Sequence, residues 1–141
     1  MPRAARKLSE DRLAALAALP ELELADVVRG GLPVAYLDEL LHRPGFTLRE
    51  VERLIIPRRT LVHRRERRQR LSPEESARLA RVVRILYAAR ETLGTPEKAD
   101  AWLREPNRAL GGSSPLQVAE TEPGARAIEA VLGRIAHGVF S

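Results

Sequence analysis

The sequence predicts an all-α fold, and three observations lead to that prediction. Proline and glycine interrupt the chain at short intervals, and apolar residues recur at helical spacing between them. No long stretch alternates β-branched and polar residues, as a half-buried strand would. Several times a Ser or Thr precedes a proline, which is typical of a helix that begins with a hydroxyl cap. With 141 residues the chain is about one domain long and can bury a sizeable core.

Composition limits the classes of function. The chain is 44% hydrophobic and 30% charged but only 4% aromatic, so Leu, Ala, Val and Ile must form the core. It contains no cysteine, which excludes disulfides, thiolate metal sites and a cysteine nucleophile. His42, His63 and His137 are scattered, so we expect no metal, no cofactor and no enzymatic activity. Because no membrane span or signal peptide is recognised, we expect a cytoplasmic protein.

Short helices are predicted for the first part of the chain, after a loose basic arm at residues 1–9. The Gly30-Gly31 pair ends one helix, and Pro33 suits the first turn of the next. Thr47 stands three residues before Glu50, which is the spacing of a capping box. The predicted helices of this part cover residues 11–19, 26–30, 34–42 and 48–54.

A basic helix is predicted next, with Pro57 as its first residue and Leu61 turned toward the core. A helix of about seven residues, a turn of three or four residues and a second helix form the helix-turn-helix pattern. In that motif the N-terminal residues of the second helix meet base edges in the major groove. The residues that we expect to contact DNA are Arg58, Arg59, Thr60, His63, Arg64, Arg67 and Arg68.

The distribution of charge supports this interpretation. Residues 57–90 contain eleven arginines and three glutamates, a net charge of +8, whereas the whole chain carries +5. The guanidinium fork of arginine matches phosphate oxygens and the O6/N7 edge of guanine. The alternative is a solvated helix face with ion pairs, but Glu66 is the sole acidic residue between Pro57 and Arg70.

A long helix is predicted to follow, starting at Ser72-Pro73-Glu74-Glu75 with a Ser cap and a capping-box glutamate. Arg78, Arg81, Arg84 and Arg90 fall on its polar side, where a solvated face and DNA contact are equal alternatives. Thr95-Pro96 and Ser114-Pro115 repeat the cap, with a long turn around residues 105–116. Trp102, Leu103 and Leu110 are expected in the core. The predicted helices of this part cover residues 73–93, 96–104 and 123–136.

Two segments together resemble a known family. They are "RTLVHRRERRQRLSPEESARLARVVRI" and "AWLREPNRALGGSSPLQVAETEPGARAIEAVLGRIAHGVFS", and the chain resembles antitoxins of the Xre/MbcA/ParS type over roughly residues 25–141. The second segment is the more specific. Its matching residues are Trp102-Leu103, Pro106-Asn107, Leu110-Gly111-Gly112, Pro115-Leu116, Thr121, Gly124, Arg134-Ile135 and Gly138.

The resemblance implies a type II antitoxin, with an Xre-like helix-turn-helix region and a small helical toxin-binding domain. The usual partner is a RES-domain toxin encoded beside the antitoxin, which destroys NAD by glycohydrolysis or phosphorolysis. The family also implies that the C-terminal region occludes the NAD pocket of the toxin, and that the complex represses its own operon. The expected organisation is an N-terminal arm or short helix at residues 1–24, the DNA-binding region at 25–72 and the toxin-binding domain at 73–141.

The last helix and the tail after it suit a plug for a cleft, because they offer apolar area and a terminal carboxylate. Alternatively, Arg134 is an ordinary surface residue, Gly138 merely caps the helix and the tail is frayed. The residues that we expect to contact the toxin are Arg134, His137, Gly138, Phe140 and Ser141.

Two further functions remain open at the level of the sequence. One is a stand-alone Xre-like transcriptional regulator that binds DNA and has no toxin partner. The other is a pure interaction protein whose arginine-rich helix contacts an acidic toxin surface instead of DNA. A homodimer is expected with the DNA-binding functions, because helix-turn-helix proteins commonly read two half-sites about one helical turn apart.

Overall fold

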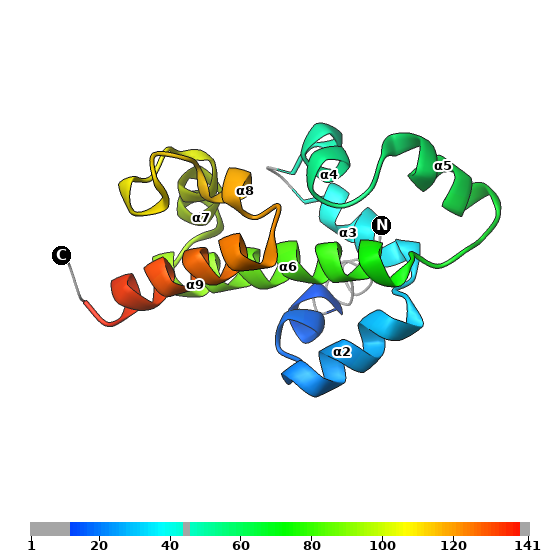
Figure 1. Ribbon diagram of the computed structural model, residues 1–141, viewed down its shortest axis with the longest axis horizontal. Coiled ribbons are helices and arrows are strands. Elements are labelled where there is room, and N and C mark those ends of the chain that lie inside the picture. The colour runs from blue at the N-terminus through cyan, green and yellow to red at the C-terminus, as the bar shows by residue number, and fades with distance from the viewer. Residues whose placement is uncertain (1–11, 44–45, 139–141) are drawn as a thin grey trace. The chain divides into compact units, whose positions relative to one another are not determined.

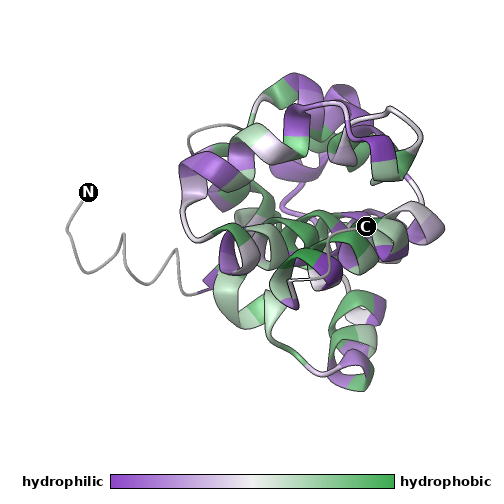
Figure 2. Cartoon of the chain, turned by 90° about the vertical axis from the view of Figure 1, so that its left-hand side faces the viewer, coloured by the Kyte–Doolittle hydropathy of each residue, from purple (hydrophilic) through white to green (hydrophobic). Residues whose placement is uncertain are grey.

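The computed structural model describes residues 12–43 and 46–138, and these residues form helices with no strand among them (Figure 1). The predicted all-α class is therefore confirmed. The chain divides into two compact units, residues 1–83 and 84–141, and the boundary falls inside the long helix α6 (Pro73–Leu93). In Figure 2 most helices carry both hydrophilic and hydrophobic residues, as expected of helices that each bury one side.

Among its described residues, the first unit contains five helical segments before α6. The predicted capping box is present at the start of α4, where the Glu50 amide donates to Thr47 Oγ1 (3.2 Å) and the Thr47 amide donates to Glu50 Oε1 (3.0 Å). Leucine and isoleucine dominate the core, as the composition predicts. The segments are residues 12–17, α2 (Glu21–Gly30), α3 (Val34–Leu41), α4 (Leu48–Leu54) and α5 (Arg58–Glu66).

Helix α2 is longer than predicted, because it begins at Glu21 and not at Asp26. Pro20 occupies its N-cap position, and the acidic residues Glu21 and Glu23 in the first turn interact favourably with the helix dipole. None of its residues is buried, and Leu22 is 83% exposed. Since no residue of α2 is buried, the periodicity of the apolar residues gives little indication of where this helix begins.

The link between α2 and α3 is bonded to the start of α6. The Leu71 amide donates to the Leu32 carbonyl (2.9 Å), and the Leu32 amide donates to Oγ of Ser76 (2.8 Å), a fully buried side chain. Gly31 has a φ of +82°, and a Cβ atom there would lie 2.5 Å from the Leu71 carbonyl oxygen. Only glycine fits this position, because any side chain would push the two segments apart.

The second unit contains two short helices where the sequence predicted a long turn. Asn107 Oδ1 accepts a hydrogen bond from the Ala109 amide (3.0 Å) and caps the first of them, and Ser114 forms a capping box with Gln117 in the second. Local polar side chains therefore order this stretch. After α6, the elements are α7 (Pro96–Arg104), the 3-10 helix η1 (Arg108–Leu110), α8 (Pro115–Val118) and α9 (Glu122–Ala136).

Two residues that were expected in the core are only half-buried. Leu103 is 1% exposed, as predicted, whereas Trp102 and Leu110 remain partly accessible. The inward side of α7 consists of Ala99 and Leu103, one turn apart, which leaves Trp102 at the edge of the buried stripe. Leu110 ends the short helix η1, which has no buried residue. The prediction for these two side chains was wrong, and both contribute apolar surface.

Candidate functional site

Helices α4 and α5 form the helix-turn-helix that the sequence predicted. Three residues, Ile55, Ile56 and Pro57, connect the two helices, and both isoleucines are at most 2% exposed. Pro57 lies at the N-cap of α5 and not at its first helical position. Leu61 is 1% exposed and anchors α5 to the core, as predicted. Buried side chains in the turn and in α5 thus fix which side of α5 faces solvent.

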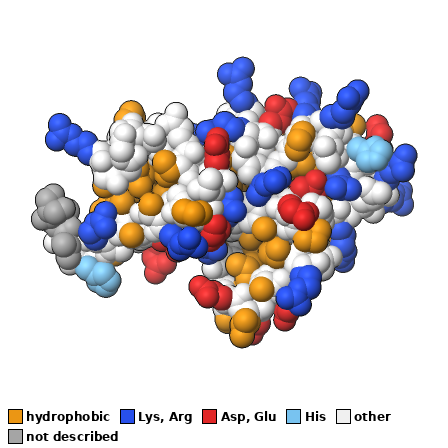
Figure 3. All heavy atoms as spheres, viewed as in Figure 1, with side chains coloured by type: hydrophobic (Ala, Val, Ile, Leu, Met, Phe, Trp, Pro, Cys, Tyr) orange, Lys and Arg blue, Asp and Glu red, His pale blue; other side chains and the backbone are white. Residues whose placement is uncertain are grey.

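Most residues that we predicted to contact DNA lie on the solvent-facing side of α5 or directly after it. Thr60 is half-buried, and the exposed members form no ion pair within the described part of the chain. In Figure 3, Lys and Arg side chains gather over the region of α5. The exposed members are Arg58, Arg59, His63, Arg67 and Arg68.

Arg64 is held by the protein itself. Its Nε and Nη2 atoms donate to the two carboxylate oxygens of Glu75, each at 3.2 Å, and Nη1 donates to Gln69 Oε1 at 3.1 Å. The side chain of Glu75 is 9% exposed, so this is a largely buried bidentate pair. The geometry gives Arg64 a structural role, and its contact with DNA stays a prediction.

Further arginines of the basic stretch also bond to the first unit. Arg65 forms an ion pair with Asp38 of α3, and Arg70 Nη1 donates to the Gly31 carbonyl (3.0 Å). Arg78 on α6 donates to the carbonyl of Ile55 in the helix-turn-helix turn (3.4 Å). Part of the positive charge therefore holds α5 in place and part of it faces outward.

Glu75 combines two functions, because it also belongs to the capping box of α6. The Ser72 amide donates to Glu75 Oε1 (2.8 Å), and the Glu75 amide donates to Ser72 Oγ (3.1 Å). Burial alone would raise the pKa of the Glu75 carboxyl, but hydrogen bonds from Arg64 and Ser72 outweigh burial and lower the pKa below the ordinary glutamate value. Glu75 is therefore held ionised as it joins α5 to the first turn of α6.

One exposed residue of α5 was missed at the level of the sequence. Val62 is 43% exposed, although an apolar residue next to Leu61 would ordinarily be assigned to the core. The outward side of α5 carries a shallow hollow, and its lining residues are Arg59, Thr60, Val62, His63 and Glu66. Counting helical turns outward from Leu61 could have identified Val62 as solvent-facing.

In the second unit, α9 is fixed by Arg84. This arginine donates from Nη2 to Glu122 and from Nε to Glu129, each at 2.9 Å. Burial would lower the pKa of Arg84, but the hydrogen bonds from its two carboxylate partners outweigh burial and raise the pKa. The Arg84 side chain is 32% exposed and pairs with both glutamates, so it positions the first two turns of α9 from the polar side of α6.

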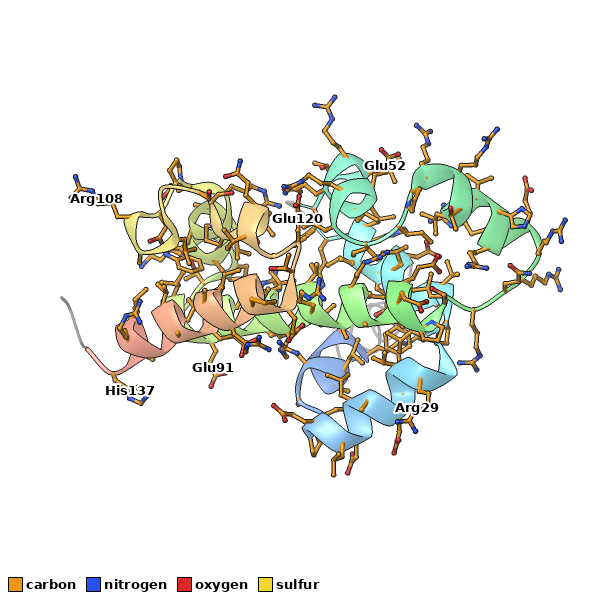
Figure 4. The ribbon with its side chains drawn as sticks, in the orientation of Figure 1. Arg29, Glu52, Glu91, Arg108, Glu120 and His137 are labelled. Carbon is orange, nitrogen blue, oxygen red and sulfur yellow. The ribbon has the colours of Figure 1, made fainter. Side chains whose placement is uncertain are left out.

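The C-terminal end of α9 is accessible. Arg134, His137 and Gly138 are all exposed, and Figure 4 shows the His137 side chain pointing away from the end of the helix. The Gly138 amide donates to the Ile135 carbonyl (3.1 Å), so this glycine does cap the helix. Phe140 and Ser141, the other two predicted toxin contacts, lie outside the described residues.

Apolar surface lies close to these residues in the second unit. Figure 3 shows hydrophobic side chains gathered over the region of α7, η1 and α9, and η1 packs against α9. The large apolar side chains of these elements that remain half-buried are Trp102, Leu110 and Ile135.

The fold defines a class of protein in which a helix-turn-helix unit precedes a second helical unit. The family model of the Antitoxin Xre-like helix-turn-helix domain matches residues 23–84, and that of the Antitoxin Xre/MbcA/ParS C-terminal toxin-binding domain matches residues 88–138. The chain belongs to the Xre antitoxin family, type II antitoxins that join these two domains.

Curated relatives agree over most of the chain. An Antitoxin Xre of Yersinia enterocolitica is 38% identical over 120 residues, which covers 84% of this chain and 81% of the relative. An Antitoxin Xre of Pseudomonas putida is 37% identical over 131 residues, 90% of this chain and 82% of the relative. An Antitoxin Xre of Photorhabdus laumondii is 32% identical over 117 residues, which covers 82% of this chain and 79% of the relative. Among the described residues, no helix combines the length and hydropathy needed to cross a membrane.

Removing Arg64 should destabilise the protein far more than removing Arg59. Arg64→Ala leaves the Glu75 carboxylate without its bidentate partner, and we expect a loss of about 1.5–3 kcal/mol in the free energy of unfolding. Arg59→Ala deletes an exposed side chain and should change that free energy by less than about 0.5 kcal/mol. Urea unfolding monitored by circular dichroism measures both values, and equal losses would show that the Arg64–Glu75 pair does not hold α5.

Acidification should remove the contribution of Glu75 to stability. The folded pKa of Glu75 is lowered, so its contribution is present above the unfolded pKa, about 4.3, and is lost as the pH falls through the folded pKa. Burial raises the pKa of Glu39, so Glu39 changes the stability with pH in the opposite direction. The informative quantity is therefore the difference in the free energy of unfolding between the wild type and Glu75→Gln. Urea unfolding between pH 7 and pH 3 should show this difference shrinking, and a constant difference would contradict the assignment.

Proposed function

We propose that this chain is the antitoxin of a type II pair whose toxin is a RES-domain enzyme that degrades NAD. The observation that carries the proposal is the match of residues 88–138 to toxin-binding domains, in one chain with a helix-turn-helix domain. The RES partner and its NAD chemistry rest on the family resemblance. The chain itself acts by binding and performs no catalysis.

On the toxin side, the exposed end of α9 and the apolar surface of the second unit form the interface. Arg134 and Ile135 lie on the last turn of α9, His137 is its C-cap, and Trp102 lies on α7. Tryptophan and arginine are the residue types most enriched where binding energy concentrates in protein interfaces. Gly138, Phe140 and Ser141 continue the interface, and this end of the chain blocks the NAD pocket of the toxin.

On the DNA side, α5 enters the major groove of an operator in the promoter of the pair and represses transcription. Arg58, Arg59, Thr60 and His63 face the bases, and Arg67 and Arg68 contact phosphates. Two copies of the chain bind as a homodimer, because helix-turn-helix proteins read two half-sites. The exposed arginines on a helix that buried residues hold in place are the support for this function.

The toxin-binding function predicts protection from NAD loss. Cells that express the RES toxin encoded beside this gene should keep their NAD and grow when the wild-type chain is co-expressed. Arg134→Glu, and a chain that ends at Gly138, should each protect at least tenfold less, because they remove interface groups without touching the core. Arg126→Glu, an exposed arginine two turns earlier in α9, is the matched control and should protect fully.

Circular dichroism should show that each variant keeps its helical content. Full protection by both Arg134→Glu and the shortened chain would contradict the proposed interface. If the neighbouring protein is harmless and the chain changes nothing, the stand-alone transcriptional regulator becomes the better account.

The DNA-binding function predicts a steep dependence on salt. If a dimer neutralises about six phosphates, the logarithm of its affinity should fall with the logarithm of the salt concentration at a slope near −5. Arg59→Ala should weaken operator binding by about 1–3 kcal/mol while losing less on random DNA, since arginine discriminates guanine from other bases. Fluorescence anisotropy measures both quantities. A salt-independent affinity would favour contact between the arginines and an acidic toxin surface.

A further inference from the structure

The outward side of α5 contains an apolar group among charged ones. Arg59, Val62, His63 and Glu66 are spaced at three or four residues, so they lie on one side of the helix, and with Thr60 they line the shallow hollow. Val62 is 43% exposed, so it exposes its two methyl groups there. Leu61, one residue earlier, takes the buried position, so Val62 has no part in the core.

A single exposed apolar residue needs no explanation on most surfaces. This one occupies the middle of a helix whose exposed neighbours are arginines, a histidine and, one turn later, Glu66. In the major groove, the one apolar group that a base pair presents is the 5-methyl group of thymine. Side-chain methyl groups contact that group, whereas polar base edges are read by hydrogen bonds.

We propose that Val62 recognises the 5-methyl group of a thymine in each half-site of the operator. Arg59 lies one turn earlier on the same side of α5 and can donate both hydrogen bonds of its fork to a guanine near that thymine. The inference rests on the proposed DNA-binding function and adds to it the identity of a base and the side chain that reads it.

Deoxyuridine isolates the methyl group, because it differs from thymidine only by lacking it. The full-length chain first selects its preferred duplex from a pool of random-sequence DNA. Each thymine of that duplex is then replaced singly by deoxyuridine, and affinities are measured for the wild type and for Val62→Ala. We expect one position in each half-site where the replacement weakens wild-type binding about fourfold, the effect of one buried methyl group.

The same replacement should cause no further loss with Val62→Ala, because the contact is already gone. Val62→Ala should unfold at the same urea concentration as the wild type, since the side chain is outside the core. Leu22→Ala removes another exposed apolar side chain, from α2, and should keep the wild-type response to every replacement.

The inference is overturned if no thymine is sensitive, or if the sensitive position responds equally in Val62→Ala. If Val62→Ala instead loses protection against the toxin and keeps its full affinity for DNA, the hollow receives a protein side chain and not a base. If no duplex is enriched over the random pool, the DNA-binding function itself is contradicted. If a duplex is enriched but none of its thymines is sensitive, only the inference about Val62 is contradicted.

Discussion

The carboxylate of Glu75 joins α5 to the start of α6. It accepts two hydrogen bonds from Arg64 of α5 and one from the amide of Ser72, which it caps at the start of α6. Oγ of the neighbouring Ser76 accepts a hydrogen bond from the Leu32 amide. The first turn of α6 therefore also holds the link between α2 and α3. A short helix of nine residues is marginal on its own and takes its position from such contacts.

This arrangement divides the arginines of the basic stretch by function. Arg64, Arg65 and Arg70 bond to groups of the first unit, whereas Arg58, Arg59, Arg67 and Arg68 form no ion pair among the described residues. Net positive charge alone attracts any polyanion. A protein that recognises a base sequence must also hold its hydrogen-bond donors at fixed positions. The arginines with protein partners hold the basic stretch in place, and the others are the ones that we propose to contact DNA. Arg84 has a comparable structural role in the second unit, where it fixes α9 through Glu122 and Glu129.

Features of the fold that depend on neighbouring residues could be predicted from the sequence. The caps at Thr47, Ser72 and Thr95 set helix starts that the structure reproduces, because a cap acts within three residues of itself. Leu61 was assigned correctly to the core for a similar reason, since the helical period fixes its side once the turn is known.

Features that depend on residues distant in the sequence could not be predicted in the same way. Glu75 lies eleven residues after Arg64, and nothing in a run of arginines indicates which member will meet a carboxylate. Trp102 and Leu110 are half-buried because of the way α7 and η1 pack on the rest of the second unit. The composition of the chain does not determine that packing. For these residues hydrophobicity predicted burial, whereas the structure leaves them at a surface suited to a partner.

The central claim is that the two functions reside on separate surfaces, α5 for the operator and the end of α9 for the toxin. One strain that carries the toxin and a reporter fused to the promoter of the pair tests it, with NAD content and reporter expression measured together. The account predicts that Arg59→Ala releases the reporter while NAD is maintained, and that Arg134→Glu loses NAD while the reporter stays repressed. If either substitution abolished both functions, or if neither changed anything, the assignment of separate surfaces would be contradicted.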